Sequence, residues 1–77
     1  MVVWHVTTLS RLTGYLQHGM ILPPVRAWCS ITAAERFSKQ TGRHIILRLK
    51  FPPNVEMLAG HRGEAVVLGV PYRFKDI

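Results

Sequence analysis

The apolar residues of this chain are gathered in short runs separated by prolines and glycines, and this arrangement restricts the fold more than any other feature. The runs at residues 2–8 and 65–68 are too short for helices and too rich in valine and other apolar residues to be loops. No apolar stretch approaches the roughly 20 residues that cross a bilayer. With 77 residues the chain has room for only one small core. We therefore expect a single domain, 1–77, containing short strands and no membrane-spanning segment.

The clearest strand is predicted at residues 44–51, where side chains alternate with the two-residue period of a half-buried sheet. One face of this segment is apolar and carries Ile45, Leu47, Leu49 and Phe51. Arg48 and Lys50 lie on the other face, together with His44 and Ile46. The pattern predicts a strand whose outer face is basic.

A first helix is predicted after the opening strand. Thr8 or Ser10 can cap its start, and Gly19 can close it after His18. Leucines recur along it at three- and four-residue spacing, at positions 9, 12 and 16. We expect this leucine stripe to pack on the sheet.

A second helix is predicted from the sequence Thr32-Ala33-Ala34-Glu35, which has the form of a capping box. It should run to about Gln40 and end at Gly42. A short strand at 25–29 precedes it, after the break at Pro23-Pro24.

Three more short strands are expected at residues 55–58, 65–68 and 72–77, with a glycine-bounded turn at 60–63. The resulting order is β-α-β-α-β-β-β-β. This order predicts an α+β fold with a small, mainly antiparallel sheet of about five to six short strands and two helices. The apolar run at 65–68 would make an exposed sheet edge adhesive, so a homo-oligomer or a larger assembly is one expectation.

The balance of charges favours an anionic partner. Ten lysines and arginines against four acidic residues give a net charge of +6, which suits nucleic acid or an acidic protein surface. Arg43, Arg48 and Lys50 are the candidate contacts. The single cysteine, Cys29, cannot form an internal disulfide, and the four histidines lack ligand spacing. We expect a cytoplasmic protein without a metal site.

Two ionisable residues lie beside the predicted core. His5 stands within the opening apolar run, and Glu64 leads the run at 65–68. A polar group left unpaired in such a place costs about 1–3 kcal/mol, so each must be hydrogen-bonded, neutralised or used in chemistry. Structural roles remain open for both, since His5 can donate to a backbone carbonyl and Glu64 can pair with a neighbouring arginine at the surface.

Taken together, these segments resemble a very short member of the ADP-ribosyltransferase fold. That superfamily includes diphtheria-toxin-like enzymes, DNA-modifying ADP-ribosyl toxins and RNA 2′-phosphotransferases. The resemblance lies in the histidine of Trp4-His5-Val6-Thr7-Thr8, in the helix ending Leu16-Gln17-His18-Gly19, and in a late strand that begins with an acidic residue, Glu64. It also includes the segment from Trp28 to Phe37, with Ser30 between them. Trp28 stands where a tyrosine is usual, and the chain is shorter than the members of the family.

The resemblance implies a set of roles around a bound NAD. His5 would hold a ribose hydroxyl, Trp28 and Phe37 would enclose the nicotinamide ring, and Glu64 would bond the nicotinamide ribose. Arg26, or alternatively Arg11, would take the pyrophosphate. By this resemblance His5 and Glu64 are the catalytic residues of an enzyme that modifies nucleic acid or a nucleic-acid-associated protein.

The residues also admit a protein without catalysis. In that interpretation Trp28 and Phe37 belong to the core, and the chain is a small basic binding module of the kind that phages supply as inhibitors or regulators. Arg48 and Lys50 would then contribute more to function than His5 or Glu64.

Overall fold

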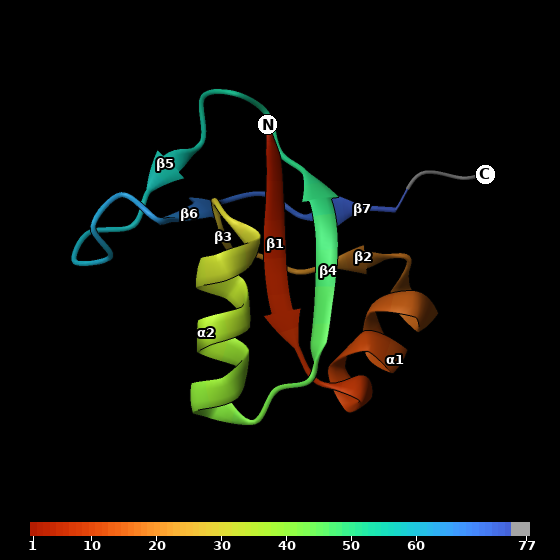
Figure 1. The fold of residues 1–77 in the computed structure, drawn as a ribbon. Helices are drawn as coiled ribbons and strands as arrows, with labels where there is room; N and C mark the ends of the chain where they lie inside the picture. Colours follow the sequence, from red (N-terminus) through yellow and green to blue (C-terminus); the bar gives the residue numbers. More distant parts are fainter. Residues whose placement is uncertain (75–77) are drawn as a thin grey trace.

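The computed structural model describes residues 1–74 and shows an α+β domain with two helices and mostly antiparallel strands, as the sequence predicts (Figure 1). The elements in chain order are β1 (Val2–Thr7), α1 (Leu9–His18), β2 (Met20–Ile21), β3 (Val25–Trp28), α2 (Ile31–Thr41), β4 (Ile45–Lys50), β5 (Glu56–Met57), β6 (Ala65–Leu68) and β7 (Tyr72–Arg73). The additional strand is β2, which no local sequence pattern predicts. Its two residues are ordered as a strand because they pair with β7, at the far end of the chain.

Five strands form the main sheet in the order β4-β1-β3-β6-β5, and β2 and β7 form a separate two-stranded sheet. All pairings are antiparallel. The main sheet is strongly paired on both sides of its middle but weakly across it. β1 pairs with β4 over six residues and β3 pairs with β6 over four, whereas β1 and β3 are joined only at Trp4 and Trp28. The sheet is therefore two halves that meet at one residue pair.

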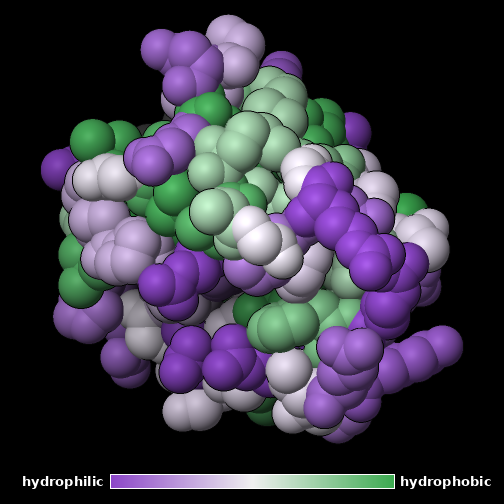
Figure 2. All heavy atoms as spheres, turned by 90° about the vertical axis from the view of Figure 1, so that its left-hand side faces the viewer, coloured by the Kyte–Doolittle hydropathy of each residue, from purple (hydrophilic) through white to green (hydrophobic). Residues whose placement is uncertain are grey.

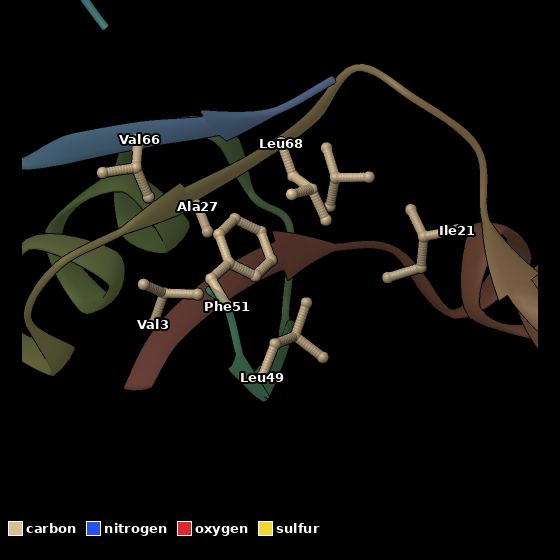
Figure 3. Packing of buried hydrophobic residues seen from close by; sticks show 8 residues of the cluster. Val3, Ile21, Ala27, Leu49, Phe51, Val66 and Leu68 are labelled. Carbon is tan, nitrogen blue, oxygen red and sulfur yellow. The ribbon is translucent and has the colours of Figure 1, made fainter. Parts of the chain in front are cut away.

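The hydrophobic core lies on one face of this sheet. Val3, Ala27, Leu49 and Val66 come from four adjacent strands and point to the same side, where Ile21 of β2 closes the cluster (Figure 3). Phe51, Leu68, Tyr72 and Phe74 also pack there. The small sheet of β2 and β7 thus covers the core face.

The second helix, α2, lies on the opposite face. Trp28 alternates with the core residue Ala27 and so points away from the core, and Phe37 of α2 packs against it. Ala33 and Ala34 are the buried residues of this helix. Their small side chains let α2 approach β1, β3 and β4 closely.

The helix ends follow the predicted chemistry with one correction. Thr8 caps α1 by accepting a hydrogen bond from the Arg11 amide, and Gly19 and Gly42 end the two helices in the left-handed conformation. The cap of α2 is Ser30, whose hydroxyl accepts from the Ala33 amide at 3.1 Å. The predicted cap at Thr32 is wrong, because the helix begins at Ile31 with Ser30 as its extended cap residue, so that Thr32 lies inside the helix.

The leucine stripe of α1 packs differently from the prediction. Leu9 and Leu16 are 68% and 66% exposed, and only Leu12 is half-buried. Tyr15, which is one turn from Leu12, packs against the core instead. The helix is anchored by Leu12 and Tyr15, and its outer leucines face solvent.

The late strands also differ in position from the expectation of an adhesive edge. β6 is flanked by β3 and β5, and its residues Val66 and Leu68 are buried within this chain. Residues 65–68 therefore form an inner strand of the sheet and not an exposed edge. Of the strand predicted at 72–77, residues 72 and 73 form β7, and residues 75–77 lie outside the described part of the chain.

Candidate cleft between the two halves of the sheet

The principal cleft of the molecule opens where β1 and β3 separate. Its volume is about 490 Å³, within the about 300–1,000 Å³ that is usual for ligand sites. It passes between the strands, so its lining includes His5 from the core face of β1 and Trp28 from the α2 face of β3. A continued ladder would bring Val6 opposite Arg26, but the strands are not paired there.

His5 fills part of this gap and bonds to the strand across it. Its Nδ1 lies 2.6 Å from the Arg26 carbonyl oxygen, so Nδ1 carries the proton and donates. In the neutral ring Nε2 is then an acceptor, and the Tyr15 hydroxyl donates to it at 3.2 Å. Thr7 lies 3.4 Å from the same tyrosine oxygen. The imidazole is held from both sides by protein groups.

The position of His5 also fixes its charge. Burial lowers the pKa of His5 below its ordinary value of about 6.5, the hydrogen bond from Nδ1 to Arg26 opposes this, and the positive charges of Arg11 and Arg43 lower it further. The lowered pKa favours the neutral ring, and a neutral ring can make both hydrogen bonds described above.

Trp28 and Phe37, which were predicted to enclose a flat ligand ring, are in contact with each other. Their ring centroids are 5.3 Å apart with planes at 46°. His61, from the turn before β6, also lies edge-on to Trp28, with the two ring centroids 5.8 Å apart. These three side chains separate the cleft from a smaller hollow of about 200 Å³ and line both. Trp28 forms the wall between the two spaces.

The cleft is positively charged. Arg11, Arg26 and Arg43 line it, and no aspartate or glutamate does so among the described residues. Arg43 is also held over the Phe37 ring, at 5.8 Å from its centroid. The face that includes α2 and β5 has hydrophilic side chains around apolar patches (Figure 2). The cleft thus combines aromatic and apolar walls with cations that suit an anionic ligand.

Glu64 lines the smaller hollow and is not among the residues of the larger cleft. Its carboxylate lies 3.7 Å from the Arg36 guanidinium, in a pair whose side chains are 59% and 42% exposed. Its backbone is fixed more firmly, since its carbonyl accepts from Cys29 at 2.7 Å. Glu64 and His5 therefore lie on different sides of the Trp28 wall.

The three basic residues predicted to contact a partner do not form one patch. Arg48 and Lys50 are exposed and lie on one face of β4, as the alternation predicts. Arg43 precedes that strand and faces Phe37 and the cleft. Its position links it with Arg11 and Arg26 instead.

Two residues of the cleft were missed in the sequence. Tyr15 has a weak signal, because it lies three positions after Leu12 and shares its face of the helix. His61 has none, because its place beside Trp28 depends on the turn between β5 and β6. Here Gly60, Arg62 and Gly63 all have positive φ angles, and the Ala59 carbonyl accepts from Nδ1 of His61 at 2.9 Å.

Within residues 1–74, histidine, cysteine, aspartate and glutamate side chains form no group of three or more that could hold a metal ion. Over the same range, neither helix has the length and apolar character needed to span a membrane.

Comparisons with protein-family models, with curated proteins and with solved structures find no match to this chain.

Proposed function

We propose that this protein is an ADP-ribosyltransferase-like domain that binds a dinucleotide between the two halves of its sheet. More particularly, we propose that NAD is its substrate, and that its target is a nucleic acid or a nucleic-acid-associated protein. The observation that carries the proposal is the cleft at the split between β1 and β3, which contains His5, Trp28 and Phe37 together with three arginines.

The lining of the cleft suits the parts of such a substrate. Trp28 supplies an aromatic face for a flat cationic ring, which stacking and cation–π attraction would favour. Arg26 and Arg11 would bind the pyrophosphate, since a guanidinium group can donate two parallel hydrogen bonds to phosphate oxygens. Because both His5 nitrogens already have partners, we expect His5 to shape the cleft and to offer a ribose hydroxyl a bond shared with Tyr15.

Glu64 supplies the carboxylate that the reaction requires. Cleavage of the bond between nicotinamide and ribose leaves the electron pair on nicotinamide and builds positive charge on the sugar, which a nearby carboxylate stabilises. The exposed pair with Arg36 holds Glu64 only weakly. The proposal requires this side chain to turn past Trp28 toward the cleft when the substrate is bound.

The test is a calorimetric titration of NAD into the protein, followed by assays of nicotinamide release. We expect binding that Arg26→Ala weakens and that Glu64→Gln leaves nearly unchanged, while Glu64→Gln abolishes release. Lys39→Ala, on the exposed side of α2, is the control for loss of a positive charge. Absence of NAD binding, or binding and release unaffected by both site variants, would refute the proposal.

A second candidate is a basic binding module without catalysis. Both proposed catalytic groups already have partners within the protein, which favours this function. His5 is hydrogen-bonded through both ring nitrogens, and Glu64 pairs with Arg36. Affinity for a nucleic acid that falls steeply with salt, because counterions are released, would support it. A substantial loss of that affinity in Arg48→Ala, with NAD inert, would favour this function over the enzyme.

A further inference from the structure

A second feature of the fold is the free edge of β4. β4 is an end strand of the main sheet, and within residues 1–74 its only strand neighbour is β1. The bonding pattern shows which of its backbone groups are open. Met1 and Phe51 exchange two backbone hydrogen bonds, of 2.6 and 2.8 Å, just beyond the ladder between β1 and β4.

Such bonded pairs alternate along an antiparallel ladder with pairs whose backbone groups point away from the partner. Leu49 and Leu47 therefore bond to β1, and Lys50, Arg48 and Ile46 direct their N–H and C=O groups to the free edge. The Lys50 amide agrees with this direction, because it donates to the Tyr72 hydroxyl at 3.1 Å on that side. Among residues 1–74 no hydrogen bond reaches the edge groups of Ile46 or Arg48. The tyrosine closes one end of the edge and leaves the rest open.

The side chains around this open edge are basic. Arg48 and Lys50 are exposed on one face of β4, and this strand contains no acidic residue. A second copy of the chain would bring the same cations to the same edge, where like charges oppose pairing. A phosphate backbone would meet the Ile46 and Arg48 carbonyl oxygens, which repel it. The backbone of an added strand, in contrast, offers N–H and C=O groups that can pair with those at the free edge of β4. Carboxylate side chains on that strand would complement the positive charges of Arg48 and Lys50.

We propose that the open edge of β4 binds an extended acidic peptide segment by strand addition. The backbone of the segment pairs with Ile46 and Arg48, and its carboxylates contact Arg48 and Lys50. This surface does not involve the cleft residues, so the inference stands whether or not the cleft binds NAD.

The test is an NMR titration of the isotope-labelled protein with a blocked peptide of alternating glutamate and valine. The matched control is the same peptide carrying N-methyl groups on alternate residues, which keeps the charges but removes the donors that a strand needs. We expect the first peptide to shift the Ile46 and Arg48 amides and to slow their exchange with solvent. The N-methylated peptide should leave both amides unchanged.

Charge variants test the acidic character of the partner. The double variant Arg48→Glu and Lys50→Glu should weaken binding by about tenfold or more, because two attractive pairs become repulsive. Lys39→Glu reverses a charge on α2, outside the edge strand, and should weaken binding much less. Amide spectra of each variant establish that the sheet is intact.

Any one of the following results would overturn the inference: equal binding of the two peptides, shifts confined to the residues of the cleft, or no change at millimolar peptide. A single-stranded oligonucleotide that protects the Ile46 and Arg48 amides as strongly as the acidic peptide would also do so.

Discussion

The two sides of Trp28 differ in how firmly their ionisable group is held. On the cleft side, His5 is half-buried and bonds through both ring nitrogens, to the Arg26 carbonyl and to the Tyr15 hydroxyl. On the other side, Glu64 is 42% exposed and has a single ion pair at 3.7 Å. The imidazole is held between two elements of the fold, whereas the carboxylate is part of an exposed side chain on a hydrogen-bonded backbone. The cleft is thus preformed, and any catalytic step depends on a group that can still move.

The largest effect is expected from His5→Ala, which removes the bond to Arg26 across the split in the sheet and the bond to Tyr15 of α1. Leaving the Arg26 carbonyl and the Tyr15 hydroxyl without their partner should lower the free energy of unfolding by about 1–3 kcal/mol. Urea denaturation followed by circular dichroism measures this. His5→Asn, which retains a donor close to the Nδ1 position, should lose less. Equal losses in the two variants would show that packing, not the bond to Arg26, holds the ring.

A smaller effect is expected from Tyr15→Phe. This change keeps the aromatic packing against the core but removes the donor to Nε2 of His5, and should cost about 1 kcal/mol. The same denaturation experiment applies, with His5→Ala and Tyr15→Phe combined in one chain. Because the two residues share a bond, the combined loss should be less than the sum of the single losses. A simple sum would contradict the bonding described for the cleft.

Acid should weaken the fold through His5. Burial lowers the pKa of this base in the folded chain, while the unfolded chain has a value of about 6.5. Between these two values the unfolded state binds a proton that the folded state does not, so the free energy of unfolding falls as pH decreases through this window. Denaturation at a series of pH values should show this slope in the parent protein and a shallower one in His5→Asn. An unchanged slope would place the pH dependence elsewhere.

The smallest effect is expected from Glu64→Gln. An exposed ion pair contributes at most about 1 kcal/mol, so the variant should unfold within about 0.5 kcal/mol of the parent. Arg36→Gln is the matched change on the other partner and should behave in the same way. A loss as large as that of His5→Ala would mean that Glu64 is a structural residue, and would remove the contrast between the two sides of Trp28.

The sequence patterns predicted correctly those features that depend on neighbouring residues, such as helix ends and the two faces of a strand. Thr8, Gly19 and Gly42 mark helix ends because a cap depends on a few neighbouring residues. The alternation in 44–51 predicted both faces of β4, including the exposure of Arg48 and Lys50. The capping box at Thr32 failed for a related reason, since Ser30, two residues earlier, offered an equally good cap.

The sequence by itself therefore determined the two helices, most strands, the positive charge and the placement of His5 and Glu64 beside the core. Only the tertiary structure decided which strands pair, that β2 joins β7, and that β6 is enclosed between two neighbours. It also decided that His5 and Glu64 line different spaces, both of which include Trp28, and that Tyr15 binds the imidazole. The physical reason is range: caps and alternation depend on adjacent residues, whereas strand order and the walls of a cleft arise from contacts between residues far apart in the chain.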